Sequence, residues 1–308
     1  MAQHIQTAAG IIPGDAAKRM LSAGSSTRYE ALSQPPRPGS WDAAYWAAVS
    51  RLMRALAPLS EGMRIGYRYG FDSGEMLDYV YENRARGRFG VGRLLDRIYL
   101  DAAGWRGIRQ RKMHLQDVLR ATIEGLRPAH QSLHVVDVAA GPGRYLLEVL
   151  AESTDGIQAT LRDWDEAGLT QGRTLAQQLG VSNVRYVRGD AFDPDDLARI
   201  SPPPQIVIVS GLYELFPDNA LIRRSLRGIY DLLTPGGRLV YTNQPTHPQL
   251  EFIARCLPNR DGKPWVMRLR SQEEMDVLVA DAGFQHRTTL VDRWGIFTVS
   301  VADKPSQG

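Results

Sequence analysis

HVVDVAAGPGRYLLEVL, residues 134–150, predicts a strand, a tight turn and a helix in direct succession. A short apolar run ends at Asp137, the turn passes through Gly141 and Gly143, and apolar residues then return with helical spacing. Glycine permits a sharp turn and lets a ligand approach the backbone without a Cβ in the way. The free N–H groups at the start of the following helix can bind a carboxylate or a phosphate. This stretch therefore predicts a ligand-binding turn after a buried strand.

Short β-rich runs alternate with helix-length segments from here to the end of the chain. In order they are HVVDVA, QATLRD, NVRYVRG, QIVIVSG, GRLVYTNQ, QHRTTLVD and GIFTVSVAD. The first five are separated by long connections, which right-handed crossovers between parallel strands require. Only RWG separates the last two runs, which is typical of an antiparallel hairpin. The expected fold class is α/β, with a mostly parallel sheet of seven strands and an antiparallel last strand.

Three regions are expected along the chain. Residues 1–40 mix Gly, Ser, Pro and Gln and predict a flexible tail or linker. Residues 41–128 have apolar residues at helical spacing and predict an N-terminal helical cap, and residues 129–308 form the ligand-binding domain. The aromatic residues around GYRYGFDSGEMLDYVYENRARGR belong to a core face or, alternatively, to a lid over an aromatic or apolar acceptor. Within the cap, helical tracts are expected over residues 41–59, 75–85, 91–102 and 112–126.

Composition excludes several classes of protein. The 37 basic and 34 acidic residues nearly balance, and without a basic tract no nucleic-acid partner is expected. The single cysteine, Cys256, excludes an internal disulfide and a cysteine metal cluster, and no metal site is expected. No apolar run approaches about 18 residues, so no membrane span is expected. A cytoplasmic location is predicted, and a homodimer remains open.

The glycine turn departs from a dinucleotide fingerprint. In G-x-G-x-x-G counted from Gly141, the third glycine position is Leu146, which does not favour a pyrophosphate. The turn has the form D-x-A-x-G-x-G through Asp137, Ala139, Gly141 and Gly143. This resembles (D/E)-x-G-x-G-x-G, the first motif of Rossmann-like S-adenosylmethionine-dependent methyltransferases. Ala139 replaces the first glycine and crowds the loop slightly. These four residues are candidate cofactor contacts.

The resemblance implies S-adenosylmethionine as cofactor and gives roles to the ends of later strands. Asp163 ends the second strand, where a carboxylate can accept hydrogen bonds from two ribose hydroxyls, and Trp164 follows it. Asp190 and Ala191 end the third strand and would receive the adenine. Ser210 follows the fourth strand and would line the methionine end. The sequence LLTPGGRLVYTN resembles the family's entry to the fifth strand.

A closer resemblance covers more of the chain. GWRGIRQRKMHL, DVAAGPGRYLLEVL, SGLYELFPDN and PWVMRLRSQEEMDVLVADAGF together are similar to a bacterial family of methyltransferases, some of which follow a hydrolase-like domain. This resemblance extends back to about Arg64. It implies methyl transfer to a small-molecule acceptor, for which natural products and lipid-related molecules are options, and it names no particular acceptor.

Methyl transfer requires alignment of the attacking atom and, for some acceptors, removal of a proton. His247 is the first candidate base because imidazole titrates near neutral pH, although a plain loop histidine is the alternative. Tyr213 and Glu214 follow the fourth strand directly; Tyr213 alternatively closes the cofactor pocket and Glu214 alternatively caps a helix. Arg109 or Arg111 is expected to pair with the methionine carboxylate.

Other functions remain open at this point. A NAD-linked oxidoreductase is opposed by the missing third glycine and by the Asp190-Ala191 pair. A regulatory or scaffold protein that binds S-adenosylmethionine without turnover would carry the same motifs. An RNA methyltransferase is opposed by the lack of an N-P-P-Y-like run after the fourth strand and of an RNA module in the first 128 residues.

Overall fold

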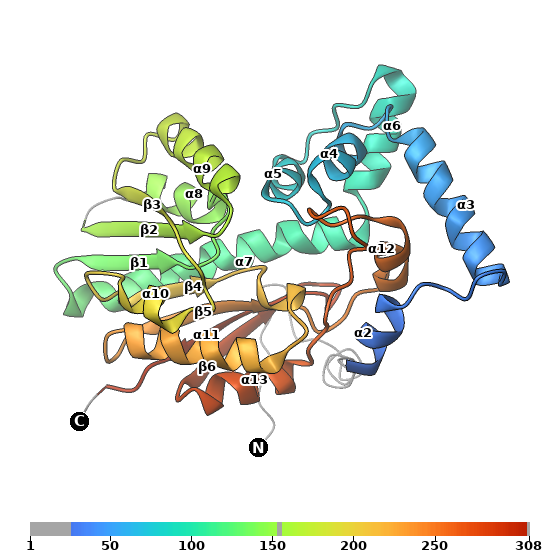
Figure 1. The fold of residues 1–308 in the computed structure, drawn as a ribbon. Helices are drawn as coiled ribbons and strands as arrows, with labels where there is room; N and C mark the ends of the chain where they lie inside the picture. The colour runs from blue at the N-terminus through green and yellow to red at the C-terminus, as the bar shows by residue number, and fades with distance from the viewer. Residues whose placement is uncertain (1–25, 153–155, 307–308) are drawn as a thin grey trace.

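The computed structural model describes residues 26–152 and 156–306 and is built around one seven-stranded sheet (Figure 1). The strand order is β3-β2-β1-β4-β5-β7-β6. Strands β1 to β5 pair in parallel, and β7 runs antiparallel to both β5 and β6. The predicted fold class is therefore confirmed. The strands are β1 (Leu133–Asp137), β2 (Ile157–Asp163), β3 (Val184–Arg188), β4 (Ile206–Val209), β5 (Arg238–Asn243), β6 (Gln285–Val291) and β7 (Thr298–Asp303).

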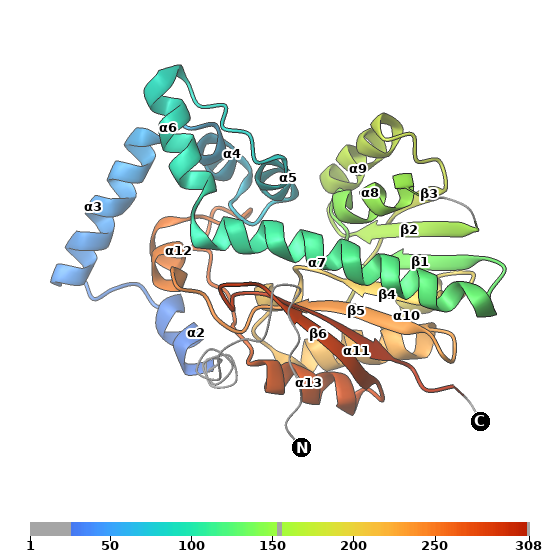
Figure 2. The ribbon, with the colours of Figure 1, turned by 180° about the vertical axis from the view of Figure 1, so that it is seen from behind.

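Helices cover both faces of the sheet. One face carries α7, α8 and α9, and α7 crosses the strands in the foreground of Figure 2. The other face carries α10, α11 and α13, which lie along the lower front of the view in Figure 1. The bounds are α7 (Ala103–Leu126), α8 (Arg144–Glu152), α9 (Glu166–Gln178), α10 (Pro194–Ala198), α11 (Asn219–Leu232) and α13 (Gln272–Asp281), with single 3-10 turns at η1 (Arg127–Ala129) and η2 (Tyr213–Leu215).

The interior strand β1 shows why the sheet is covered on both sides. All five of its residues are buried, as expected of a parallel strand between two helical layers. Val135 packs into the apolar cluster under α7 and α8, whereas its neighbour Val136 packs into the cluster under α11. Each fully buried valine contributes about 1.5–3 kcal/mol to folding. The sheet is therefore held between two separate apolar layers, and loops rather than helices surround the ends of its strands.

The N-terminal cap is a group of helices at one end of the sheet (Figure 1). Serine side chains begin three of these helices: Ser40 and Ser60 each accept a hydrogen bond from a backbone amide three residues on, at 3.2 Å, and Ser73 does the same. The second helix was not expected, because it is only nine residues long and contains two glycines. The cap helices are α3 (Trp41–Leu56), α4 (Glu61–Tyr69), α5 (Gly74–Glu82) and α6 (Phe89–Leu100).

The cap core also contains side chains from the C-terminal half of the chain. Leu250 and Ile253 of α12 (Leu250–Cys256) and Phe297 pack in the same apolar cluster as Phe71 and Met76. Cys256 is free and buried there, as expected of a small apolar residue. The cap is thus not a contiguous unit of residues 41–128, and the proposed boundary near 128 does not separate two cores.

Helix α7 joins the two cores. The helical tract predicted over residues 91–102 is confirmed as α6, whereas the tract predicted over residues 112–126 is part of a longer, 24-residue helix that runs from Ala103 to Leu126. Trp105, near its start, packs in the cap cluster, and Leu119 packs against the sheet. The residues halfway along this helix therefore lie at the boundary between the cap and the sheet.

Part of the expected tail is ordered. Residues 26–33 form the helix α2 (Ser26–Ser33), in which Leu32 is buried. Arg255 of α12 donates hydrogen bonds to the carbonyl oxygens of Ala31 and Leu32, at 3.3 and 3.2 Å. The expectation of a flexible tail is therefore wrong for this segment. Residues 34–40 form neither a helix nor a strand, and residues 1–25 lie outside the described residues.

Candidate functional site

A cavity of about 540 Å³ lies at the carboxyl ends of β1, β2, β3 and β4, and we call it the strand-end cavity. Loops after parallel strands converge at this edge of an open α/β sheet, which is where such sheets bind ligands. Eight of the residues predicted to contact a cofactor line it: Ala139, Gly141, Gly143, Asp163, Trp164, Asp190, Ala191 and Ser210.

The two glycines of the turn serve different purposes. Both have positive φ, +52° at Gly141 and +73° at Gly143. A Cβ on Gly141 would meet nothing within 4 Å, so this backbone faces open space. A Cβ on Gly143 would lie 2.1 Å from a methyl carbon of Leu161 on β2. Gly141 therefore keeps the cavity accessible, and Gly143 allows the turn to pack on the sheet.

Asp163 ties the glycine turn to the end of β2. One carboxylate oxygen accepts a hydrogen bond from the Gly141 amide at 2.7 Å, and the other accepts one from the Asp165 amide at 2.9 Å. Each oxygen of a carboxylate can accept more than one hydrogen bond. Asp163 lines the cavity and so retains acceptor capacity for two hydroxyl groups of a ligand.

The other wall suits a flat ring. The Asp190 carboxylate accepts a hydrogen bond from the Phe192 amide at 2.8 Å, which orders the loop after β3. Trp164 is 65% exposed, and the Arg188 guanidinium lies 4.7 Å from its ring centre. Trp164 and Phe192 both line the cavity. Two aromatic side chains beside a carboxylate fit a planar nitrogen base next to a sugar.

Asp137 does not line the cavity, which corrects its assignment as a direct contact. Its side chain is fully buried, accepts a hydrogen bond from the Ala139 amide at 3.2 Å and pairs with the Tyr145 hydroxyl. Burial raises the pKa of Asp137 to about 7. Asp137 therefore supports the glycine turn from beneath.

Arg109 does not line the strand-end cavity, and this assignment is corrected as well. It lies 4.0 Å from Asp101, and burial lowers its pKa. Residues two apart on a helix face different directions, so Arg111 points elsewhere. Arg111 lines the strand-end cavity, is 3% exposed, and has one guanidinium nitrogen 3.4 Å from the Glu214 carboxylate. Arg111 is thus the arginine that the fold brings to the site.

Tyr213 points away from the site. Its side chain is 2% exposed in the cluster under α11, and its hydroxyl is 2.9 Å from the Ser225 hydroxyl. Burial raises the pKa of Tyr213. The expected role of Tyr213 in contacting the reacting groups is therefore corrected. Its neighbour Glu214 faces the site instead, because successive side chains of the η2 turn point in different directions.

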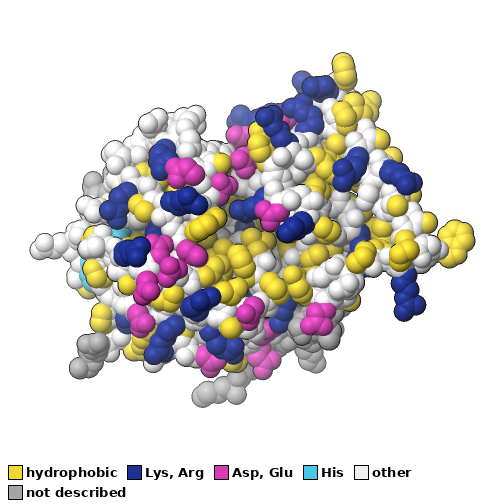
Figure 3. All heavy atoms as spheres, viewed as in Figure 1, with side chains coloured by type: hydrophobic (Ala, Val, Ile, Leu, Met, Phe, Trp, Pro, Cys, Tyr) yellow, Lys and Arg dark blue, Asp and Glu magenta, His cyan; other side chains and the backbone are white. Residues whose placement is uncertain are grey.

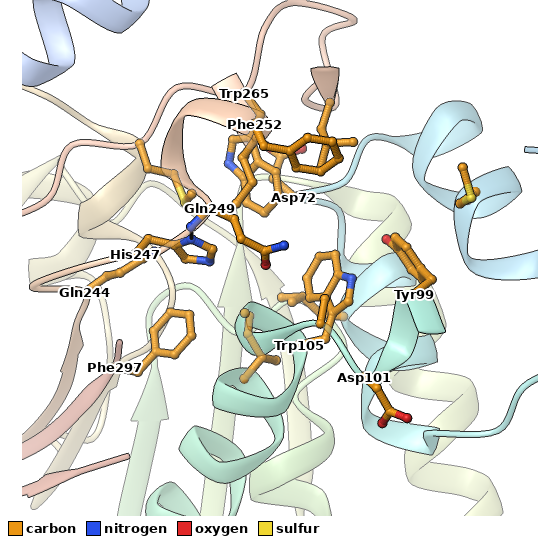
Figure 4. A pocket seen from close by; sticks show the side chains of 18 of the residues that line it. Asp72, Tyr99, Asp101, Trp105, Gln244, His247, Gln249, Phe252, Trp265 and Phe297 are labelled. Carbon is orange, nitrogen blue, oxygen red and sulfur yellow. Dashed lines mark hydrogen bonds between the residues drawn. The ribbon is translucent and has the colours of Figure 1, made fainter. Parts of the chain in front are cut away.

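A second cavity of about 620 Å³ adjoins the first, between the cap, α7 and the segments after β4 and β5; we call it the cap chamber (Figure 4). In Figure 3, hydrophobic side chains gather on this side of the molecule, between the sheet and the cap. Sequence reasoning missed the aromatic walls Trp105, Phe252 and Trp265, because their apolar spacing equally fits core residues. The residues common to both cavities are Asp72, Leu77, Arg111, Gly211 and Leu215.

His247 lies on the wall of the cap chamber and faces its interior in Figure 4. Its Nδ1 accepts a hydrogen bond from the Gln249 amide at 3.0 Å, which leaves the proton on Nε2. Burial lowers the pKa of His247 to about 4. The imidazole is therefore neutral near pH 7 and offers the chamber a hydrogen-bond donor, an arrangement that suits orientation of a ligand better than removal of its proton.

The cap helix α5 closes over the glycine turn. A Cβ on Gly74 would lie 3.0 Å from the ring of Pro142, so the two backbones nearly touch. Asp78 on the same helix pairs with Arg144, the first residue of α8. On the other side, the Asp72 carboxylate accepts a hydrogen bond from the Arg260 amide at 2.7 Å. The cap thus forms the outer wall of the strand-end cavity.

Within residues 26–152 and 156–306, no group of three or more His, Cys, Asp or Glu side chains is placed to hold a metal ion. No helix in the same ranges has the length and apolar character needed to cross a bilayer.

Comparison with known proteins identifies related chains. "Uncharacterized protein YnbC" of Escherichia coli K12 is 48% identical over 280 residues, which cover 90% of this chain and 48% of YnbC. The chain therefore spans about half the length of this curated relative.

Two solved structures share the fold. A Bordetella parapertussis protein, described as a possible exported protein, superposes with a TM-score of 0.64 at 21% identity, covering 94% of this chain and 93% of the other. Magnesium protoporphyrin IX methyltransferase from Synechocystis PCC 6803 superposes with a TM-score of 0.52 at 15% identity, covering 77% and 98%.

The family described as "Putative methyltransferase" matches residues 13–304, which is nearly the whole chain. The sheet order, the antiparallel last strand and the turn at the end of β1 agree with this match. The chain belongs to this family, and its sheet shares the fold of the Synechocystis methyltransferase.

Proposed function

We propose that this protein binds S-adenosylmethionine in the strand-end cavity and transfers its methyl group to a small molecule in the cap chamber. The observation that carries the proposal is the open space above Gly141, bounded by the carboxylate of Asp163 and joined to a second cavity. When bound, S-adenosylmethionine supplies an electrophilic methyl group on a positively charged sulfur.

The residues of the cavity fit the three parts of this cofactor. Asp163 holds the ribose hydroxyls, and Asp190 with Ala191 receives the adenine between aromatic side chains. Arg111 replaces Arg109 as the partner of the methionine carboxylate: its Nε has no hydrogen-bond partner among the described residues, and an arginine fork binds carboxylates well.

The arrangement of the two cavities supports transfer rather than binding alone. They meet at Arg111, Gly211 and Leu215, so an acceptor in the cap chamber lies next to the methionine end of the cofactor. The cap helix α5 covers the glycine turn and keeps water from the reacting groups. Alignment in a dry site supplies much of the catalysis that methyl transfer needs.

Parallel calorimetric titrations with S-adenosylmethionine, S-adenosylhomocysteine and NAD test the proposal. We expect both adenosyl compounds to bind with micromolar affinity and NAD not to bind. Binding of NAD alone would refute the assignment of the cavity. Turnover is then measured as S-adenosylhomocysteine release with cell extract as the acceptor source; tight binding without any release would favour a regulatory or scaffold protein.

The predictions of partner and location are separate from this proposal. Action on a small molecule rather than nucleic acid and a cytoplasmic location stay predictions. Size-exclusion chromatography with light scattering addresses the homodimer. The division into a cap and a ligand-binding domain is proposed with α7 shared by both.

A further inference from the structure

The cap chamber has the features of a binding site for a particular chemical class. Its walls are largely apolar, and its volume of about 620 Å³ lies in the range that encloses a drug-sized ligand. The rings of Trp105 and Trp265 are stacked, with centres 6.3 Å apart and planes 24° apart. Tyr99 packs against Trp105 with a centre distance of 5.7 Å. Flat aromatic walls favour a flat aromatic occupant.

Every charged side chain on the chamber wall already has a partner of opposite charge. Asp72 pairs with Arg260, which lies beside the chamber, at 3.4 Å. Arg97 and Asp101 pair at 2.8 Å. The third pair is Arg111 with Glu214 at 3.4 Å. Each wall charge is thus compensated within the protein, and burying an uncompensated charge on a ligand is costly. The chamber therefore favours a neutral molecule over a phosphate-bearing one.

Some neutral polar atoms of the wall lack partners. The side-chain nitrogens of Gln244 and Trp265 are buried donors without a hydrogen-bond partner among the described residues. Gln244 is 1% exposed. Buried donors in folded proteins are rarely unpaired, so such atoms in a cavity wall indicate a ligand that pairs with them. A ligand oxygen that accepts hydrogen bonds would pair with these two nitrogens.

Glu214, by contrast, has a hydrogen-bond acceptor that lacks a donor. One of its carboxylate oxygens faces Arg111, and the other is buried without a partner among the described residues. Glu214 is 7% exposed and lies on the chamber wall next to Gly211, where the two cavities meet. A buried carboxylate oxygen requires a donor. A hydroxyl group on the ligand both donates and accepts, and so satisfies Glu214 and the unpaired donors together.

We infer that the acceptor is a neutral aromatic molecule with a hydroxyl group, and that Glu214 takes the proton of this hydroxyl as it is methylated. This inference rests on the proposed function. The hydroxyl oxygen forms a bond to the methyl carbon, the bond from that carbon to sulfur breaks, and sulfur keeps the electron pair as a neutral thioether. The hydroxyl proton passes to the unpaired oxygen of Glu214. An aromatic hydroxyl has a pKa of about 10, far below that of an aliphatic one, so a carboxylate can assist its loss.

Three probes test the acceptor class on the full chain saturated with S-adenosylhomocysteine: naphthol, naphthoate and decanol. Binding is followed by quenching of tryptophan fluorescence, since Trp105 and Trp265 line the chamber. We expect naphthol to bind at least about 10-fold more tightly than anionic naphthoate, whose charge would be buried unpaired. Decanol binds more weakly than naphthol. Equal or tighter binding of naphthoate or decanol would overturn the inference.

Glu214→Gln tests the proton transfer, with Glu251→Gln as its matched control on the exposed side of α12. Methylation of naphthol by the Glu214 variant falls about 100-fold at neutral pH and recovers above the pKa of naphthol, where the hydroxyl ionises unaided. The control keeps the wild-type rate. An unchanged rate in the Glu214 variant, or no recovery at high pH, would contradict the assigned role.

Gln244→Leu is the second variant, which keeps the shape of the side chain and removes its donor. Naphthol affinity falls about 10-fold, and S-adenosylhomocysteine affinity is unchanged. The two proposals fail differently. Loss of S-adenosylhomocysteine binding in the wild type would reject the proposed function, whereas binding of that compound without selective binding of naphthol would reject only the inference.

Discussion

The Asp78 carboxylate of the cap helix α5 is paired with the guanidinium of Arg144, the first residue of α8, with Oδ2 and Nη2 2.9 Å apart. Gln171 of α9 donates to the same carboxylate at 3.3 Å. Both members of the ion pair are mostly buried. Because α8 begins directly after Gly143, this contact ties the cap to the turn that lines the strand-end cavity.

Asp78→Ala is expected to weaken S-adenosylmethionine binding about 10-fold, because a charged hydrogen bond such as the one that ties the cap to the glycine turn contributes about 1.5–3 kcal/mol. Arg144 keeps Glu148 at 3.7 Å, so the fold survives. Asp117→Ala, which removes an exposed pair with Arg120, is the control. Calorimetry measures the affinity of both variants for S-adenosylmethionine. Equal affinities would show that cofactor binding does not depend on the pair between Asp78 and Arg144.

Asp163→Ala should reduce cofactor affinity about 10- to 100-fold, because it removes the acceptor for the ribose hydroxyls and releases the Gly141 amide. Asp165→Ala is the comparison, since Asp165 caps α9 by accepting from the Ala167 amide at 3.0 Å. That variant loses about 1 kcal/mol of stability and little affinity. If titrations instead show the larger loss of cofactor affinity in Asp165→Ala, then Asp165 rather than Asp163 contacts the ribose.

Gly141→Val places a side chain in the open space of the cavity and is expected to abolish cofactor binding. Gly180→Val is matched to it, because Gly180 also has positive φ, at +69°, and open space around its Cβ direction. Each substitution costs about 1–3 kcal/mol of backbone strain. Thermal unfolding measures the loss of stability that both variants share. Titration measures the loss of cofactor binding that is expected only in Gly141→Val. Normal binding by the Gly141 variant would refute a close approach of the ligand to this backbone.

Asp137 makes stability depend on pH. Burial raises its pKa from 3.8 to about 7, so the folded state holds a proton that the unfolded state has already released between these values. The contribution of Asp137 to stability is therefore complete below pH 3.8 and is lost as the pH rises toward 7. Urea unfolding at several pH values is expected to show this loss in the wild type and its absence in Asp137→Asn. Parallel curves for the two proteins would disprove it.

Asp96 organises the cap and should not affect the sheet. Its carboxylate accepts hydrogen bonds from the Ser60 hydroxyl at 2.7 Å, the Gly62 amide at 2.9 Å and the Arg86 amide at 2.8 Å. In Asp96→Ala each buried donor left unpaired costs about 1–3 kcal/mol. Hydrogen exchange should accelerate in α4 and α6 while β1 stays protected. Asp42→Ala, on the exposed side of α3, is the control; uniform acceleration would mean that the cap and sheet unfold together.

The local sequence was sufficient to predict the sheet and most residues of the strand-end cavity. Parallel strands with long crossovers have one preferred handedness, so the residues at their carboxyl ends meet at one edge whatever the helices contain. That is why Gly141, Asp163 and Asp190 could be named from their places after strands. The choice between Arg109 and Arg111 depends on which side of α7 faces the cavity. That orientation could not be predicted, because the 24-residue length of α7 was not foreseen.

The cap chamber depended on contacts between distant segments. Trp105 and Trp265 stack although 160 positions separate them in the sequence, and Glu214 meets Arg111 across 103 positions. The sequence favoured Tyr213 over its neighbour Glu214 as a contact, but packing under α11 and the contact with Ser225 turn Tyr213 inward. Strand order and turn chemistry follow from local propensities, whereas the side chains that enclose an acceptor are chosen by which apolar faces pack together. The residues of the strand-end cavity could therefore be predicted from the linear sequence, whereas the cap chamber forms only because the cap, α7 and the C-terminal segments share one core.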